Sequence, residues 1–216
     1  MRSIRLAVAL AVSASLFGLW TTSVTAATEG PDTQRGAASP VEFKLVRSST
    51  TRAADCIDGA RARAEIRQRR GIEIMTLSAR GLPARTTFVV WINQIPDAPF
   101  GISWYLGDMT TDADGTVSET FRGRFSIESF AVAPGVTRAP VIHPNGMFPD
   151  ASKNPSFAPV HMHHVGLWFE SPADAAAAGC PDAQTPFNGD HTAGVQAMST
   201  RNYPNRQGPL QLVPGG

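Results

Sequence analysis

Thr86-Thr-Phe-Val-Val-Trp-Ile92 decides the fold class, because every residue in this run is β-branched or aromatic and so favours a strand. Residues 41–45 alternate apolar and charged side chains. Residues 61–69 alternate charged side chains with small or apolar ones, with one exception. Arg70-Gly71 suits a turn, and residues 72–79 then continue as a strand. This recurring period of two predicts half-buried strands.

The remaining segments extend the same pattern. An Asp-Gly turn within residues 112–115 predicts a hairpin between the runs on either side of it. Residues 172–178 predict a helix, because Ser171 is a good N-cap and Gly179 follows the end. Further strands are predicted at residues 104–109, 116–122, 125–132, 160–169 and 192–199. About eight or nine short strands, one short helix and no βαβ alternation predict an all-β, antiparallel immunoglobulin-like β-sandwich.

The N-terminal segment has the order of a secretory signal peptide. Arg2 and Arg5 form a positive start, residues 6–20 are largely apolar, and residues 24–26 (Val-Thr-Ala) resemble a cleavage site. A bilayer span needs about 20 strongly apolar residues, and serines and a glycine dilute this run. We therefore expect residues 1–26 to be removed, the protein to be secreted into an extracytoplasmic compartment, and the mature chain to have no transmembrane segment.

The rest of the chain predicts a single domain. Residues 27–40 are small and polar and predict a flexible leader. Residues 41–216 are expected to form a single β-sandwich domain. Within it, residues 133–159 contain six prolines and predict a long Pro-rich loop. So long a connection in a compact domain is often functional when it is ordered.

Charge and cysteine content exclude several classes of protein. The 216 residues carry 19 Lys and Arg against 18 Asp and Glu, a net charge of +1. Removing Arg2 and Arg5 with the signal peptide changes that charge to −1. A chain this close to neutral is not a nucleic-acid-binding protein by bulk charge. Two cysteines exclude a Cys-rich zinc or iron–sulfur module, and in an oxidising compartment Cys56 and Cys180 are expected to form a disulfide.

All the histidines lie in the C-terminal third, and three fall in the run His161-Met-His-His164. On a strand, His161 and His163 would share one face, since successive side chains alternate between faces. Such a pair could reach one copper or zinc ion, with His143, His191 or Asp190 as a third ligand. The alternatives are histidines held in hydrogen bonds without a metal, and a pH-sensing role.

Four arginines, Arg61, Arg63, Arg67 and Arg69, line one face of the predicted strand at residues 61–69, with Glu65 between them. A helix is possible here because Ala, Arg and Glu are good helix formers, but every charge falls on one parity. Guanidinium groups in a row can bind phosphate, sulfate or carboxylate groups. The alternative is a solvated charged face that protects a sheet edge from aggregation.

Motifs for hydrolysis and for nucleotide binding are missing from the sequence. The chain has no G-x-S-x-G, H-E-x-x-H, P-loop or G-x-G-x-x-G pattern. Such an absence favours a protein that is not an enzyme. The sequence therefore predicts a binding or structural module for an extracellular or cell-wall ligand. The alternative is a metal-binding protein or metalloenzyme that uses the histidine cluster with copper or zinc.

Two parts of the chain carry a family resemblance. Residues 74–88, with a Gly-Leu-Pro turn, and residues 110–116 resemble secreted bacterial β-sandwich domains. Residues 166–174 and 185–191 resemble uncharacterised secreted actinobacterial proteins with an immunoglobulin-like β-sandwich domain. The resemblance implies a sandwich fold and export, and it implies no activity because its motifs are structural.

Overall fold

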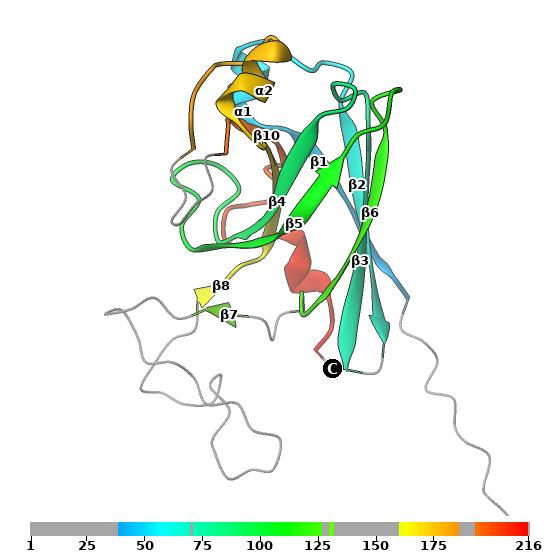
Figure 1. Ribbon diagram of the computed structural model, residues 1–216. Helices are drawn as coiled ribbons and strands as arrows, with labels where there is room; N and C mark the ends of the chain where they lie inside the picture. Colours follow the sequence, from blue (N-terminus) through cyan, green and yellow to red (C-terminus); the bar gives the residue numbers. More distant parts are fainter. Residues whose placement is uncertain (1–38, 70, 127–129, 132–159, 186–192, 216) are drawn as a thin grey trace, which may run out of the picture. The chain divides into compact units, whose positions relative to one another are not determined.

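The computed structural model describes residues 39–69, 71–126, 130–131, 160–185 and 193–215. These residues form an antiparallel β-sheet of eight strands in the order β5-β4-β9-β10-β1-β2-β3-β6 (Figure 1). The all-β, sandwich-like fold class predicted from the sequence is thus confirmed. The eight strands are β1 (Val41–Arg47), β2 (Arg61–Arg69), β3 (Ile72–Arg80), β4 (Thr87–Asn93), β5 (Ser103–Thr110), β6 (Val117–Gly123), β9 (His164–Phe169) and β10 (Gln196–Ser199).

One layer of the sandwich consists of β1, β2, β3 and β6 in continuous antiparallel register. In β2, Ala62, Ala64 and Ile66 are buried, whereas the four arginines on the opposite face of the strand are exposed. The strand spans the same residues, 61–69, that the alternation predicts. A strand that buries one face therefore follows directly from the period of two.

The second layer consists of β5, β4, β9 and β10. All six residues of β9 are buried, and so are the last six of β4, because each of these strands has neighbours on both sides and is covered on both faces. On the outer face, Val89, Trp91, Trp168 and Ala193 form a second apolar cluster, against which Phe100 packs. Burial on two faces explains why residues 88–92 of this run are apolar without alternation.

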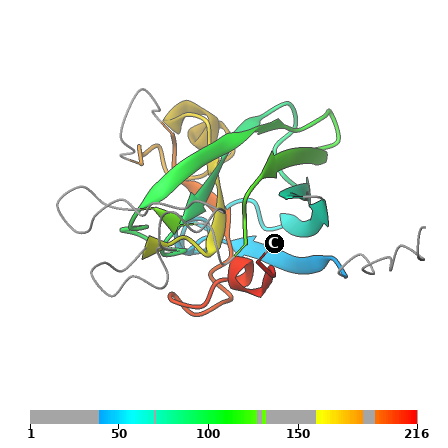
Figure 2. The same cartoon turned by 90° about the horizontal axis from the view of Figure 1, so that it is seen from below.

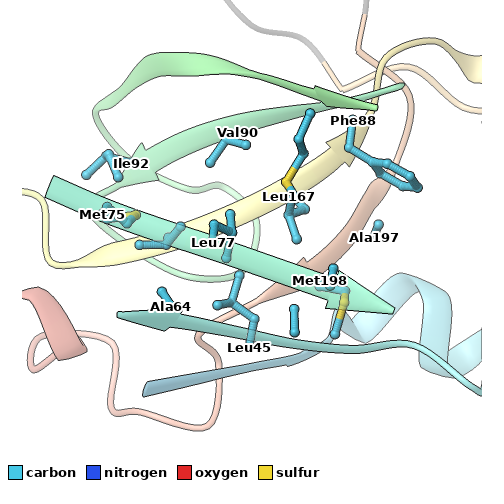
Figure 3. Packing of buried hydrophobic residues seen from close by; sticks show 14 of the residues in the cluster. Leu45, Ala64, Met75, Leu77, Phe88, Val90, Ile92, Leu167, Ala197 and Met198 are labelled. Carbon is cyan, nitrogen blue, oxygen red and sulfur yellow. The ribbon is translucent and has the colours of Figure 1, made fainter. Parts of the chain in front are cut away.

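The two layers join through β1, whose last residues pair with β10 at Val46↔Ser199 and Arg47↔Met198. Figure 2 shows yellow β9 and orange β10 between green β4 and blue β1. The core lies between the layers, where side chains from both sets of strands meet (Figure 3). Met75, Leu77 and Phe88 are fully buried there.

Two short helices lie at the same end of the sandwich (Figure 1). Helix α2 (Pro172–Ala177) starts as predicted, since the Ser171 hydroxyl accepts a hydrogen bond from the Asp174 N–H at 3.1 Å. Helix α1 (Ser49–Ala53) was not predicted, and a 3₁₀ turn, η2 (Pro209–Leu212), lies near the C-terminus. The predicted disulfide between Cys56 and Cys180 is present and joins the segment after α1 to the segment after α2 across 124 positions.

The predicted hairpin between residues 104–109 and 116–122 is wrong. β5 pairs with β4, and β6 pairs with β3, so the turn at residues 112–115 connects the two layers. The turn itself forms, because Asp112 Oδ1 accepts hydrogen bonds at 2.9 Å from the N–H groups of Asp114 and Thr116. Turn chemistry shows where the chain reverses and leaves open which strands pair.

The predicted strand at residues 160–169 is also wrong in part, because Met162 and His163 interrupt it. Residues before the break form β8 (Val160–His161), which pairs with β7 (Phe130–Ala131), and residues after it form β9. The backbone carbonyl of His163 accepts a hydrogen bond from the Leu210 N–H at 3.2 Å, so it is bonded to η2 and not to a neighbouring strand.

Of the predicted strand at residues 125–132, the structure describes Phe125 and Ser126, which lie outside any strand, and residues 130 and 131, which form β7. The N–H groups of Phe125 and Ser126 donate to the buried carboxylate of Glu73, which is 1% exposed. A side chain in β3 thus takes the hydrogen bonds that a neighbouring strand would otherwise accept.

Several predictions concern residues outside the described part of the chain. These are the signal peptide at residues 1–26, most of the leader at residues 27–40, and the Pro-rich loop at residues 133–159. His143 and His191 also lie outside it. Among the described residues, no helix has the length and apolar character needed to cross a membrane.

Candidate anion-binding site

The predicted arginine row lies on the outer face of the β1–β2–β3–β6 layer. Arg61, Arg63, Arg67 and Arg69 are all exposed, and the register adds basic side chains from the neighbouring strands. Lys44 lies opposite Arg63. We call this surface the basic face and define it by its seven exposed basic residues, Lys44, Arg61, Arg63, Arg67, Arg69, Arg80 and Arg122.

Two acidic residues, Glu42 and Glu65, share this face, and they neutralise only part of it. The guanidinium of Arg67 donates a hydrogen bond to the Glu65 carboxylate. This hydrogen bond lowers the pKa of Glu65, and the charges of Arg67 and Arg63 act in the same direction. The same contact raises the pKa of Arg67. The guanidinium of Arg67 is therefore bonded to an acid of the same strand. This pair separates Arg61 and Arg63 from Arg69.

The end of the basic face away from Glu65 and Arg67 contains a hollow of about 380 Å³. Three residues with buried side chains, Leu45, Ala62 and Ala79, are among those that line it. We call it the basic hollow. The side chains that define it come from three adjacent strands and are Lys44, Val46, Arg61, Arg63, Ser78 and Arg80.

The register explains why the surface is hollow at this point. Ser78 of β3 lies opposite Arg63 of β2, so a short side chain stands beside a long one. The Ser78 hydroxyl lies 2.9 Å from that of Ser118 on β6. Arg61 lies opposite Arg80. Long basic side chains thus surround the short side chain of Ser78, which leaves a hollow in the surface of the sheet.

The four cations of the basic hollow have no carboxylate partner in the part of the chain that the structure describes. Among the described residues, Lys44, Arg61, Arg63 and Arg80 form no ion pair with any acid. The Arg61 guanidinium donates to the backbone carbonyls of Asp58 at 3.0 Å and Ala60 at 2.7 Å, which orients it. An arginine fork binds planar and tetrahedral oxyanions bidentately, and lysine adds a point charge. The arrangement can therefore bind an anion.

The histidine cluster occupies a separate region. The rings of His161 and His163 are stacked with their centroids 5.1 Å apart, although the strand is broken between them. The Nε2 atom of His163 is buried and has no hydrogen-bond partner among the residues that the structure describes. Burial, followed by the charges of His161 and His164, lowers the pKa of His163 to about 4. His163 is thus a neutral imidazole at neutral pH.

His164 is fully buried and held by two hydrogen bonds. Its Nε2 donates to the backbone carbonyl of Asn205 at 3.1 Å, because a carbonyl can only accept. Its Nδ1 accepts from the Thr200 hydroxyl at 3.0 Å. Burial lowers the pKa of His164, and its hydrogen bonds to backbone groups act in the opposite direction. This residue serves the packing between β9 and the C-terminal segment.

The structure does not assemble the predicted metal site from described residues. No group of three or more His, Cys, Asp or Glu residues in the described ranges is placed to hold a metal ion. The other predicted ligands, His143, His191 and Asp190, fall outside those ranges. His161 and His163 do lie side by side, but through stacked rings at the strand break and not, as the alternation predicted, on one face of a continuous strand.

Sequence reasoning found Arg61 and Arg63 but missed the other four side chains that define the basic hollow, Lys44, Val46, Ser78 and Arg80. Lys44, Ser78 and Arg80 lie on strands β1 and β3, and only the pairing register places them beside β2. The sequence contained one indication of this, because Lys44 is a basic residue in the alternating run at residues 41–45. No family model matches this chain, and a search of curated proteins finds no match either.

Proposed function

We propose that this protein is an extracytoplasmic binding module that binds an anionic extracellular or cell-wall ligand through the basic face. The observation that carries the proposal is the basic hollow, where Lys44, Arg61, Arg63 and Arg80 gather without a carboxylate partner among the described residues. The removal of residues 1–26, export, and the resemblance to secreted actinobacterial proteins with an immunoglobulin-like domain belong to the same proposal.

The position of β2 supports a binding role over edge protection. Charged side chains protect a sheet from aggregation when they lie on its edge strands. β2 pairs with β3 over its whole length and with β1 at residues 62–66, so Arg63 lies between two paired strands, whereas Arg67 and Arg69 lie beyond the residues that pair with β1. Arg63 of the basic hollow therefore protects no edge, and its place beside another cation on an interior part of the sheet is better explained by binding.

The distribution of charge also supports the proposal. The expected mature chain carries a net charge of −1, yet the basic face has seven basic and two acidic side chains. Like charges opposite one another on a sheet destabilise the fold. A surface that keeps such repulsion in a nearly neutral protein is suited to a negative ligand, whose binding relieves the repulsion.

Retention on an anionic resin tests the proposal. We expect the chain from Ala27 onward to bind phosphocellulose at low salt and to elute as salt screens the charges. An Arg61→Gln/Arg63→Gln variant should elute at clearly lower salt. The matched control, Arg52→Gln/Arg206→Gln, removes two exposed charges outside the basic face and should elute closer to the unmodified chain. Equal shifts for the two variants would refute the basic face as the binding surface.

A metal-binding function is the second candidate, and one observation favours it. A buried nitrogen without a hydrogen-bond partner is uncommon in folded proteins, and the Nε2 atom of His163 is such an atom. A zinc or copper ion shared with His161 would satisfy it. Elemental analysis after dialysis without chelator should then find near-stoichiometric metal in the unmodified chain and none in a His161→Ala/His163→Ala variant. Metal-free protein whose thermal stability does not change on adding zinc or copper would exclude this function.

A further inference from the structure

The two ends of the basic face differ in a way that identifies the ligand more closely. At one end, Arg67 is bonded to Glu65, and Arg69 and Arg122 lie beside Ile72 and Ile74. At the other end, four cations surround the basic hollow, and none of Arg67, Arg69 and Arg122 lines it. A polymer held by charge alone would use the whole row evenly, which this arrangement does not favour.

The sheet geometry brings the four cationic groups within reach of one point. Lys44 lies opposite Arg63, Arg61 lies opposite Arg80, and the two pairs are two residues apart along β2. Neighbouring strands are about 4.8 Å apart, and residues two apart on a strand are about 7 Å apart. The long side chains can therefore converge above the hollow, where the shorter Val46 and Ser78 leave room.

On this basis, and resting on the proposed function, we propose that the basic hollow is a discrete site for one phosphoryl group carried on a small organic residue such as a sugar. A phosphate monoester has a charge of about −1.5 to −2 near neutral pH and three strong acceptor oxygens. That charge matches several cations better than the single charge of a carboxylate or sulfate ester does. The arginine forks would bind its oxygens in pairs.

The size and lining of the hollow point to the organic residue. Its volume of about 380 Å³ falls within the range of small-molecule pockets, about 300–1,000 Å³, and far exceeds that of a bare ion. Val46 and the aliphatic stems of the basic side chains supply apolar contact. The Ser78 hydroxyl can bond to a sugar hydroxyl at the floor. The phosphoryl group would be held at the rim and its carrier below.

Titration calorimetry on the chain from Ala27 onward tests the inference, with glucose 1-phosphate, glucuronate, glucose and inorganic phosphate as probes. We expect glucose 1-phosphate to bind, inorganic phosphate and glucuronate to bind at least about fivefold more weakly, and glucose not to bind. Equal affinity for glucuronate and glucose 1-phosphate would overturn the phosphoryl assignment. Equal affinity for inorganic phosphate would overturn the organic carrier.

Two matched pairs of variants locate the site. Arg63→Gln should weaken glucose 1-phosphate binding about tenfold or more, the cost of a charged hydrogen bond, whereas Arg69→Gln on the same strand should change it by less than about twofold. Ser78→Leu fills the hollow without changing the charge and should also weaken binding at least about tenfold. Thr76→Leu, on the same face of β3, should not. Circular dichroism confirms that each variant is folded.

The outcomes separate this inference from the proposed function. Suppose that Arg63→Gln and Arg69→Gln weaken resin retention equally and that Ser78→Leu has no effect on the binding of any probe. The basic face then attracts anions by its overall charge and not at one site. The discrete site is then refuted, whereas anion binding stands. If neither arginine variant alters retention on phosphocellulose, both proposals fail.

Discussion

Lys44 on β1 and Arg63 on β2 are register partners in an antiparallel pair, and both are exposed on the same face of the sheet. Neither forms an ion pair with an acid among the described residues. Two cations held at this distance repel each other, because directly opposed residues bring their Cβ atoms to about 4.5–5.5 Å. This repulsion destabilises the fold, and the two cations line a hollow. We therefore attribute their arrangement to the binding of an anion.

Arg63→Gln should therefore make the free protein more stable while it weakens anion binding. We expect a gain of about 0.2–1 kcal/mol in the free energy of unfolding at low salt, the range of cross-strand charge pairs. Urea denaturation at low ionic strength measures this gain, which should shrink at high salt because screening weakens the repulsion in the unmodified chain. A variant that is less stable than the unmodified chain at low salt would contradict the argument.

The disulfide should contribute strongly to stability. Cys56 and Cys180 close a loop of 124 positions, and the chain-entropy treatment assigns up to about 5 kcal/mol to so long a loop. We expect a Cys56→Ser/Cys180→Ser variant to lose about 2–5 kcal/mol of unfolding free energy in urea denaturation. Adding reductant to the unmodified chain serves as the control and should give a comparable loss. A loss below about 1 kcal/mol would show that the segments after α1 and α2 stay packed together without the disulfide.

Stability should fall as the pH decreases from about 6.5 to about 4. His163 has a pKa of about 4 when folded, below its ordinary value of 6.5, and the pKa of His164 is also lowered. The unfolded chain therefore takes up protons in this range before the folded chain does, and protonation favours unfolding. Above pH 6.5 these two residues contribute no pH dependence.

Thermal unfolding at a series of pH values, on the unmodified chain and on His163→Asn, tests this expectation. The charges that act on the two rings come from His161 and His164 on His163, and from Asp97 on His164. The variant should show a shallower decline of the melting temperature below pH 6.5. A decline of the same slope in both proteins would remove His163 from the explanation.

Glu73 should be the most sensitive acidic residue in the described sheet. Its carboxylate is 1% exposed and accepts hydrogen bonds from the N–H groups of Phe125 and Ser126. Glu73→Ala leaves two buried donors without partners, and each such group costs about 1–3 kcal/mol. We expect a loss of about 3 kcal/mol or more in urea denaturation. Exposed Glu119→Ala should stay within about 0.5 kcal/mol, and a similar result for Glu73→Ala would refute the structural role.

The sequence correctly predicted those strands and helices that are determined by residues close together in the chain. The bounds of β2 agree with its alternation at both ends, and α2 begins at the Ser171 cap, because a period of two and a capping hydroxyl act within a few residues. The hairpin at residues 104–122 was wrong because β5 and β6 find better partners in β4 and β3. Such pairing is decided by distant strands.

The residues of the candidate site also fall into those that the sequence predicted and those that only the strand register revealed. Arg61 and Arg63 were identified from the sequence because they alternate on one strand. Lys44, Ser78 and Arg80 could not be, since strand register brings them to the hollow. The break at Met162 and His163 was also missed, because it depends on a backbone hydrogen bond from Leu210, nearly 50 positions away along the chain.

Residue order alone determined that this chain forms a β-sandwich, that two cysteines could join, and that one strand carries arginines on a single face. These properties follow from side-chain periodicity and composition, which are local. Only the tertiary structure decided that Arg63 lies between two paired strands, and that two neighbouring strands complete a hollow around four cations without a carboxylate partner in the described part of the chain. Hydrogen bonding between strands far apart in the chain sets the register, and a shift of one residue would turn these side chains toward the core.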